Sequence, residues 1–162
     1  MEALDFLPLI AVLAVVVAIL TAGISSMNNG NSGKEPSKKE TAVFGNEDYN
    51  REDIIEIEFV SDTEGMNQNA WIAYVDGDIP VMAWIEKTEK GNKLFLGAEG
   101  KVRFNSYHGL FSNYSSLQEI NFNNAFDTSN ATTMSSMFSG CKALTKLNLR
   151  GFDTSNVTDM GF

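Results

Sequence analysis

The sequence contains little of the chemistry that catalytic and metal sites most often use. Its 162 residues include one cysteine, Cys141, and one histidine, His108. A single cysteine cannot form a disulfide within the chain, and one cysteine with one histidine cannot supply the four ligands of a structural zinc site. We therefore expect no bound metal and no cofactor.

Basic residues are also scarce. The chain has 12 lysines and arginines against 21 aspartates and glutamates, a formal net charge of −9 and a pI near 4.5. Proteins that bind nucleic acid use Lys and Arg to displace counterions from phosphates, so this balance argues against a nucleic-acid partner. Residues 40–107 hold 14 acidic and six basic side chains, whereas residues 108–162 are nearly neutral and rich in Ser, Thr and Asn.

One long apolar run is present, near the N-terminus. Residues 6–24 carry no charge, and at ~1.5 Å per residue such a helix crosses most of a ~30 Å hydrocarbon layer. We predict a transmembrane or signal-anchor helix over residues 6–24, after a tail of residues 1–5. A cleavable signal peptide is an alternative, because Thr21-Ala22-Gly23 offers small residues to a peptidase, although the tail is acidic rather than basic. A buried core helix is the third interpretation.

The charges after this run bear on its orientation. Lys34, Lys38 and Lys39 lie within the ~15–20 residues in which basic side chains tend to stay cytoplasmic, which alone would place the rest of the chain inside the cell. Residues 25–45 are rich in Gly, Ser and Asn and are predicted to form a flexible linker.

Residues 46–107 have the pattern of a β-rich region. Apolar and acidic residues alternate over Ile54–Val60, which predicts that Ile55, Ile57 and Phe59 share one face of a strand while Glu56 and Glu58 face water.

A hairpin is predicted to follow this first strand. Residues 71–75 and 79–85 are separated by the turn dipeptide Asp76-Gly77. Two further short strands, over 93–96 and 101–104, bring the expected number to about five.

The last third of the chain repeats itself. Phe126-Asp-Thr-Ser-Asn130 recurs as Phe152-Asp-Thr-Ser-Asn156, and residues 111–122 match residues 138–149 at an offset of 27. Both copies contain the apolar spacing L-x-x-L-x-L that is typical of leucine-rich repeats. This spacing predicts a short strand in each copy, with Leu147 and Leu149 pointing inward together.

These residues carry a resemblance to a known family. Residues 134–149 followed by 152–160, together with the preceding segments 81–84, 94–100 and 120–124, resemble the BspA-like leucine-rich repeat proteins of bacterial surfaces, whose repeats span about 26 residues. The resemblance implies an exported protein, anchored in the cell membrane or secreted, whose extended repeat surface binds extracellular proteins or cell-surface macromolecules. Against the charge rule above, we therefore predict that the repeats face the cell exterior. It brings no catalytic residues with it.

The expected fold is mainly β with short helical turns. We predict an N-terminal transmembrane helix, a small β-rich lead-in over residues 46–107, and an incomplete leucine-rich-repeat solenoid over residues 108–162. That solenoid would hold about two repeats and a truncated third, and solenoids generally need about three. The expectation is therefore that the chain is a piece of a longer repeat protein, unless the lead-in sheet caps the repeats.

We predict a non-enzymatic adhesion protein. His108 and Cys141 are the only imidazole and thiol, and Cys141 takes the position of Tyr114 one repeat earlier, which packing explains without chemistry. The alternatives are a structural remnant or stalk without a ligand, and a carbohydrate-binding β module built on Trp71, Tyr74 and Trp84. The candidate binding residues on the predicted strands of the two repeats are Gln118, Glu119, Asn121, Lys146, Asn148 and Arg150.

Overall fold

The structure, a computed structural model, describes residues 42–76 and 79–161. The predicted tail (1–5), apolar helix (6–24) and most of the linker (25–45) lie outside the described residues, as does the turn residue Gly77. Within the described ranges, no helix combines the length and the apolar character that crossing a membrane requires.

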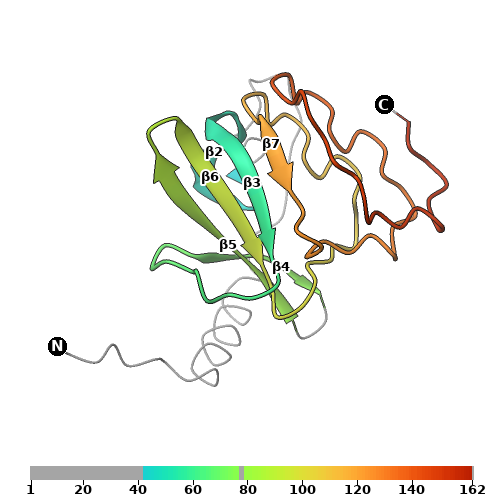
Figure 1. The fold of residues 1–162 in the computed structure, drawn as a ribbon, viewed down its shortest axis with the longest axis horizontal. Coiled ribbons are helices and arrows are strands. Elements are labelled where there is room, and N and C mark those ends of the chain that lie inside the picture. The colour runs from blue at the N-terminus through green and yellow to red at the C-terminus, as the bar shows by residue number, and fades with distance from the viewer. Residues whose placement is uncertain (1–41, 77–78, 162) are drawn as a thin grey trace, which may run out of the picture. The chain divides into compact units, whose positions relative to one another are not determined.

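One five-stranded sheet dominates the fold, in the order β4-β5-β6-β3-β7 (Figure 1). Strands β4, β5 and β6 pair antiparallel, and β3 pairs parallel with both β6 and β7. A two-stranded hairpin and one 3-10 turn precede the sheet. The elements are β1 (Ala42–Val43), β2 (Asn46–Asn50), η1 (Arg51–Asp53), β3 (Ile54–Val60), β4 (Trp71–Asp76), β5 (Ile79–Thr88), β6 (Gly91–Gly97) and β7 (Glu119–Asn121).

Strand β3 follows the predicted alternation, with one correction. Ile57 and Phe59 are fully buried, but Ile54 is buried where Ile55 was expected. The register of β3 against β6 shifts between Ile54 and Glu56, and such a bulge turns one residue to the other face. The predicted hairpin of residues 71–85 is confirmed as β4 and β5, whereas the strand predicted at 101–104 is reduced to a single bridge between Val102 and Phe126.

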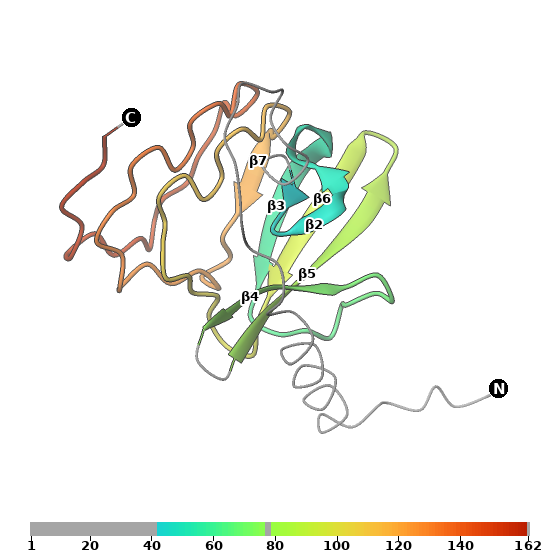
Figure 2. The ribbon, with the colours of Figure 1, turned by 180° about the vertical axis from the view of Figure 1, so that it is seen from behind.

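An aromatic cluster joins the sheet to the C-terminal coils. The ring of Phe59 on β3 lies 4.7 Å from that of Phe126, 5.4 Å from Phe122 and 6.1 Å from Phe111, measured between centroids. The coils before and after β7, residues 103–118 and 122–161, stack beside the sheet on the β7 side (Figure 2). Rings in such contacts add about 0.5–1.5 kcal/mol per pair beyond the area they bury, so this cluster holds the coils against the sheet.

The two sequence copies stack through backbone hydrogen bonds. The N–H groups of Phe111 and Asn113 donate to the carbonyls of Met137 and Ser139, at 2.9 and 2.7 Å, and Met134 donates to Asp159 at 2.8 Å. The connections within each copy are mostly turns rather than strands.

The predicted fold class is nevertheless wrong. The described residues are mainly β, with no α-helix, no helix suited to a membrane and no leucine-rich-repeat solenoid. Residues 119–121 form a strand because β3 lies beside them, but residues 145–149 form none, and Leu147 and Leu149 are 37% and 44% exposed instead of pointing inward. A strand needs backbone partners, and among the described residues no backbone hydrogen bond pairs residues 145–149 with a neighbouring strand.

Gly97, at the end of β6, tests the packing of the outer sheet face. A Cβ on this residue would lie 2.6 Å from the carbonyl oxygen of Asp62 and 2.9 Å from the Val60 side chain. We expect Gly97→Ala to lower the free energy of unfolding by about 1–3 kcal/mol, because backbone there must move. Gly65→Ala is the control, since its Cβ would meet nothing closer than 3.7 Å. Urea unfolding measures both, and equal effects would contradict the packing described.

Candidate functional site

Three of the six predicted binding residues line one recess beside β7. Asn121, at the end of β7, lines a cavity of about 290 Å3 together with Asn148 and Arg150 from the second sequence copy. The remaining lining residues are Ile120, Phe122, Asn123 and Asn124. We call this cavity, with its five polar residues Asn121, Asn123, Asn124, Asn148 and Arg150, the β7 recess.

Local sequence explains how these side chains reach the recess. Ile120 is buried, and because successive side chains on a strand alternate, Asn121 lies on the outer face. In the second copy, the backbone N–H of Arg150 donates to Oδ1 of Asn148 at 3.1 Å, a turn that asparagine forms readily. Asn148 and Arg150 are both exposed, so their remaining polar groups are available to a partner.

The other three predicted residues are exposed but do not line the recess. Gln118 anchors the start of β7, where its backbone N–H donates to the carbonyl of Ile55 at 2.8 Å. Glu119 stands opposite Glu56 of β3 in the strand register, and Lys146 lies on the second copy. The structure therefore brings Asn121, Asn148 and Arg150 together around one cavity and leaves Gln118, Glu119 and Lys146 outside it.

A charged row on the outer sheet face leads to the recess, and sequence reasoning missed it. Lys93 on β6 bridges Glu56 and Glu58 of β3, with its Nζ 2.9 Å from Oε1 of Glu56. Asn121 and Asn123 donate to Oε1 of Glu56 and of Glu58, at 3.2 and 3.1 Å. The only sequence signal was the outward alternation of the two glutamates, and it does not reveal that β6 and β7 flank them.

This row has a direct electrostatic consequence. Partial burial lowers the pKa of Lys93, but hydrogen bonds and charge attraction from Glu58 and Glu56 outweigh it and raise the pKa above its usual value. Lys93 therefore carries its positive charge between the two glutamates on this partly exposed outer face. Arg150, by contrast, forms no ion pair with any residue that the structure describes.

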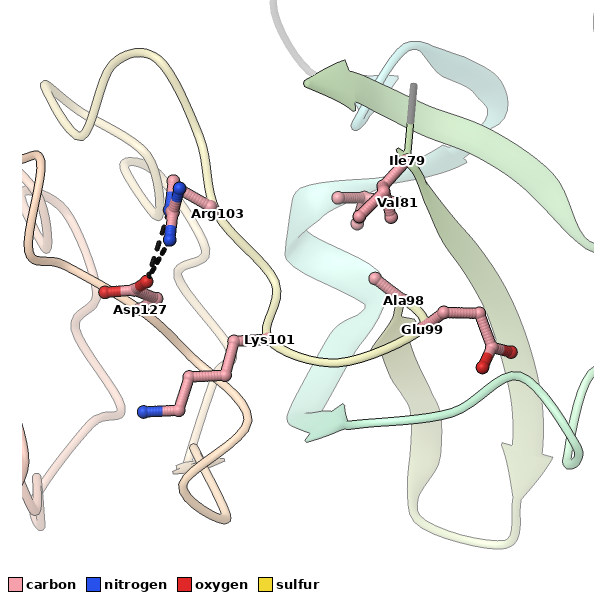
Figure 3. A pocket seen from close by; sticks show the side chains of 7 residues that line it. All are labelled: Ile79, Val81, Ala98, Glu99, Lys101, Arg103 and Asp127. Atoms are coloured by element: carbon pink, nitrogen blue, oxygen red, sulfur yellow. Dashed lines mark hydrogen bonds and ion pairs between the residues drawn. The ribbon is translucent and has the colours of Figure 1, made fainter. Parts of the chain in front are cut away.

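A second cavity lies between β5 and the start of the coils (Figure 3). Its volume is about 300 Å3. Ile79, Val81 and Ala98 form an apolar wall, and Arg103, Asp127 and Lys101 stand on the opposite side. Arg103 binds Asp127 through two nitrogens, with Nε 3.2 Å from Oδ2, so the polar wall is already largely satisfied by its own ion pair.

A third cavity, with a mainly apolar lining, lies between the two stacked copies. It has a volume of about 280 Å3 and is lined mainly by the flexible or aromatic side chains Met134, Met137, Phe138, Leu149, Phe152 and Met160. Met134 and Met137 are buried, whereas Met160 is 55% exposed. Thioethers fill irregular gaps well, which accounts for their presence between the stacked copies.

The imidazole and the thiol have separate partners. Nδ1 of His108 is 2.8 Å from the hydroxyl of Ser135, and the Cys141 thiol donates to the carbonyl of Phe111 at 3.0 Å. Burial raises the pKa of Cys141 despite opposing contributions from a hydrogen bond and from Arg51. A raised pKa disfavours the thiolate that a nucleophile needs, which agrees with a packing role.

The aromatic residues of the alternative carbohydrate site do not form one platform. Trp84 is 4% exposed and stacks on Phe95 at 5.2 Å between ring centroids. Trp71 pairs with Ala83 in the sheet register, which places it on the opposite face, where it stacks on Tyr49 at 5.8 Å. Sugar stacking across both tryptophans is therefore incompatible with this sheet. Within the described ranges, no cluster of three His, Cys, Asp or Glu side chains could hold a metal ion.

Comparison with known proteins finds one family similarity. The profile of a family described as "Mycoplasma protein of unknown function, DUF285" matches residues 103–162. This range contains every residue that lines the β7 recess, together with the two stacked copies. No curated protein and no solved structure shows significant similarity to the chain.

The Arg103–Asp127 pair makes stability depend on pH in a defined direction. Desolvation raises the pKa of Asp127, but the Ser129 N–H and the Arg103 guanidinium outweigh it and bring the pKa to about 2, below the ordinary 3.8. A carboxyl group with a depressed pKa in the folded state stabilises the fold above its unfolded pKa, and this contribution disappears as the pH falls through the folded value.

We expect Asp127→Asn to lower the free energy of unfolding at pH 7 and to have progressively less effect as the pH falls from about 4 towards 2. Asp62→Asn is the control, because Asp62 also accepts an N–H two residues along the chain but has no ion pair among the described residues. Urea unfolding at pH 7 and at pH 2.5 measures the difference. A destabilisation of the same size at both pH values would contradict the assignment.

Proposed function

We propose that this protein binds other macromolecules at the cell exterior, without catalysis, through the polar surface around the β7 recess. The observation that carries the proposal is the convergence of Asn121 from one sequence copy with Asn148 and Arg150 from the next on one cavity. The resemblance of the copies to BspA-like surface proteins supports the same class of function.

The side chains of the recess suit recognition by hydrogen bonding. Each asparagine amide offers two N–H donors and an acceptor oxygen, and an arginine offers five donors in a fixed planar arrangement. Such groups bind polar surfaces of other macromolecules, where arginine is among the residues that contribute most to affinity. The exposed Arg150 is therefore the side chain on which we expect binding to depend most.

The exterior location is testable on intact cells. With an epitope tag after Phe162, external protease is expected to remove the tag while a cytosolic control protein survives, because the proposal requires the β7 recess to face outward. Immunoblotting before and after lysis measures this. A tag that stays protected until lysis would rule out binding to extracellular partners.

The binding role is testable with the purified full chain. We expect saturable binding to at least one member of a panel of extracellular-matrix proteins or to the surface of intact cells, measured by biolayer interferometry and flow cytometry. The variant Asn148→Ala/Arg150→Ala is expected to weaken it about tenfold or more, since loss of a central arginine contact costs at least ~1–2 kcal/mol.

The matched control is Asn105→Ala/Lys142→Ala, which removes an exposed amide and an exposed cation away from the β7 recess. It is expected to bind like the unmodified chain. Absence of saturable binding to every panel member would favour the structural stalk without a ligand, and equal weakening by both double variants would exclude the β7 recess as the binding site.

A further inference from the structure

The β7 recess is a bounded space between the two sequence copies. Before the recess, the N–H of Ala143 donates to the carbonyl of Ser115 at 3.2 Å, and beyond it the N–H of Asp153 donates to the hydroxyl of Thr128 at 2.8 Å. The copies are therefore joined on both sides of a cavity of about 290 Å3. This volume lies at the lower end of small-molecule pockets, which run from ~300 to ~1,000 Å3, and it suits a single small ring rather than a chain.

The wall that the first copy contributes offers hydrogen-bond acceptors. Nδ2 of Asn123 donates to Oε1 of Glu58 at 3.1 Å and to the carbonyl oxygen of Phe59 at 3.2 Å. An amide nitrogen has two donors, so both are used, and Oδ1 of Asn123 has no donor among the described residues. Nδ2 of Asn121 donates to Oε1 of Glu56 at 3.2 Å, and Oδ1 of Asn121 likewise has no described donor. A ligand that satisfies this wall has to donate hydrogen bonds.

The turn after β7 holds this wall in position. Asn123 and Asn124 have φ angles of 47° and 56°, in the left-handed region that asparagine adopts more readily than most residues. The two hydrogen bonds from Asn123 to β3 also fix its amide before a ligand arrives. Groups that are ordered in advance lose less conformational freedom on binding.

The wall that the second copy contributes offers donors and a positive charge. Oδ1 of Asn148 already accepts the backbone N–H of Arg150 at 3.1 Å, so Nδ2 is the free part of this amide. Arg150 is exposed, and its guanidinium forms no ion pair with a described residue. An arginine binds a carboxylate through two parallel hydrogen bonds. A ligand that satisfies this wall therefore has to accept hydrogen bonds, and a carboxylate does so best.

We propose that the β7 recess binds the carboxylate-bearing terminal sugar of a glycan, with its carboxylate on Arg150 and Asn148 and its hydroxyl groups on Asn121 and Asn123. This proposal rests on the proposed binding function and names the chemical class of its ligand. An acidic sugar carries both groups that the two walls require, because hydroxyls can donate whereas an ionised carboxylate only accepts. An acidic peptide side chain supplies the carboxylate alone, and a neutral sugar supplies the hydroxyls alone.

Charge fixes the orientation of the sugar in the recess. Glu56 and Glu58 share one cation, Lys93, so the wall of the first copy is backed by a net negative charge. Like charges in proximity repel, which disfavours a ligand carboxylate on that side. The carboxylate of the sugar therefore belongs at Arg150, and the hydroxyls belong on the opposite wall.

The test uses saturation-transfer difference NMR on the purified full chain with four small probes. Methyl β-glucuronide and methyl α-sialoside carry hydroxyls and a carboxylate, methyl β-glucoside lacks the carboxylate, and acetate lacks the hydroxyls. We expect saturable binding of at least one acidic sugar, with a Kd on the order of 1 mM. Methyl β-glucoside and acetate are expected to bind about tenfold more weakly or worse, because each leaves the polar groups of one wall without a partner. The acidic sugar that binds more tightly identifies the kind of glycan.

Variants of Arg150 locate the site. Arg150→Ala is expected to weaken the acidic sugar about tenfold or more, since it removes the partner of the carboxylate. Arg150→Lys keeps the charge but loses the planar pair of donors, so we expect an intermediate loss. Asn105→Ala/Lys142→Ala is the matched control and is expected to bind like the unmodified chain. Circular dichroism and urea unfolding show that each variant is folded.

Three results would overturn the proposal. They are absence of binding by both acidic sugars, acetate binding as tightly as methyl β-glucuronide, and acidic-sugar binding that is insensitive to Arg150→Ala.

Competition distinguishes this inference from the proposed function. We expect an excess of the acidic sugar to displace the chain from the matrix proteins or cells that it binds. Binding to these partners that depends on Asn148 and Arg150 but resists the sugar would overturn the acidic-sugar site and leave the proposed function standing. Acidic-sugar binding at Arg150, without binding to any matrix protein or cell, would support the site and overturn the proposed function.

Discussion

Strand β3 is the element on which the rest of the structure depends. It pairs parallel with β6 on one edge and with β7 on the other, and so joins the antiparallel strands to the C-terminal coils. The alternation of its side chains has two consequences. Ile57 and Phe59 enter the core with no exposed surface, while Glu56 and Glu58 stand on the outer face, where they organise the polar row that ends at the β7 recess.

The aromatic core joins the β-sheet to the C-terminal coils. Phe59 from the sheet meets Phe111, Phe122 and Phe126 from the coils, and Phe122 and Phe126 in turn contact Phe152 of the second copy, at 4.9 and 5.5 Å between ring centroids. Large rings can bury much surface in a small volume. The coils, which have few strands of their own, are therefore held in place mainly by side-chain packing and by turn hydrogen bonds.

Some charged side chains on the outer sheet face and around the β7 recess are paired, and others are not. Lys93 neutralises the two glutamates of β3, and the amides of Asn121 and Asn123 complete their hydrogen bonding. A paired carboxylate gains little from a new partner, because it would have to give up the bonds it already has. On the second copy, by contrast, Asn148 and Arg150 are exposed, and Arg150 has no ion pair among the described residues.

Sequence patterns by themselves determined the local features of this protein. The alternation over residues 54–60 predicted the inward face of β3 except at its bulge, and the Asp76-Gly77 dipeptide predicted the β4–β5 hairpin. These predictions succeeded because a side chain's face and a turn's geometry depend on near neighbours. The repeat spacing failed at Leu147 and Leu149, because whether a segment becomes a strand depends on what lies beside it. Only the tertiary structure decided that β3 pairs with β6 and β7, that residues 145–149 form no strand, and that the described part of the chain holds no leucine-rich-repeat solenoid. Long-range pairing is a competition among distant segments, which no local pattern records.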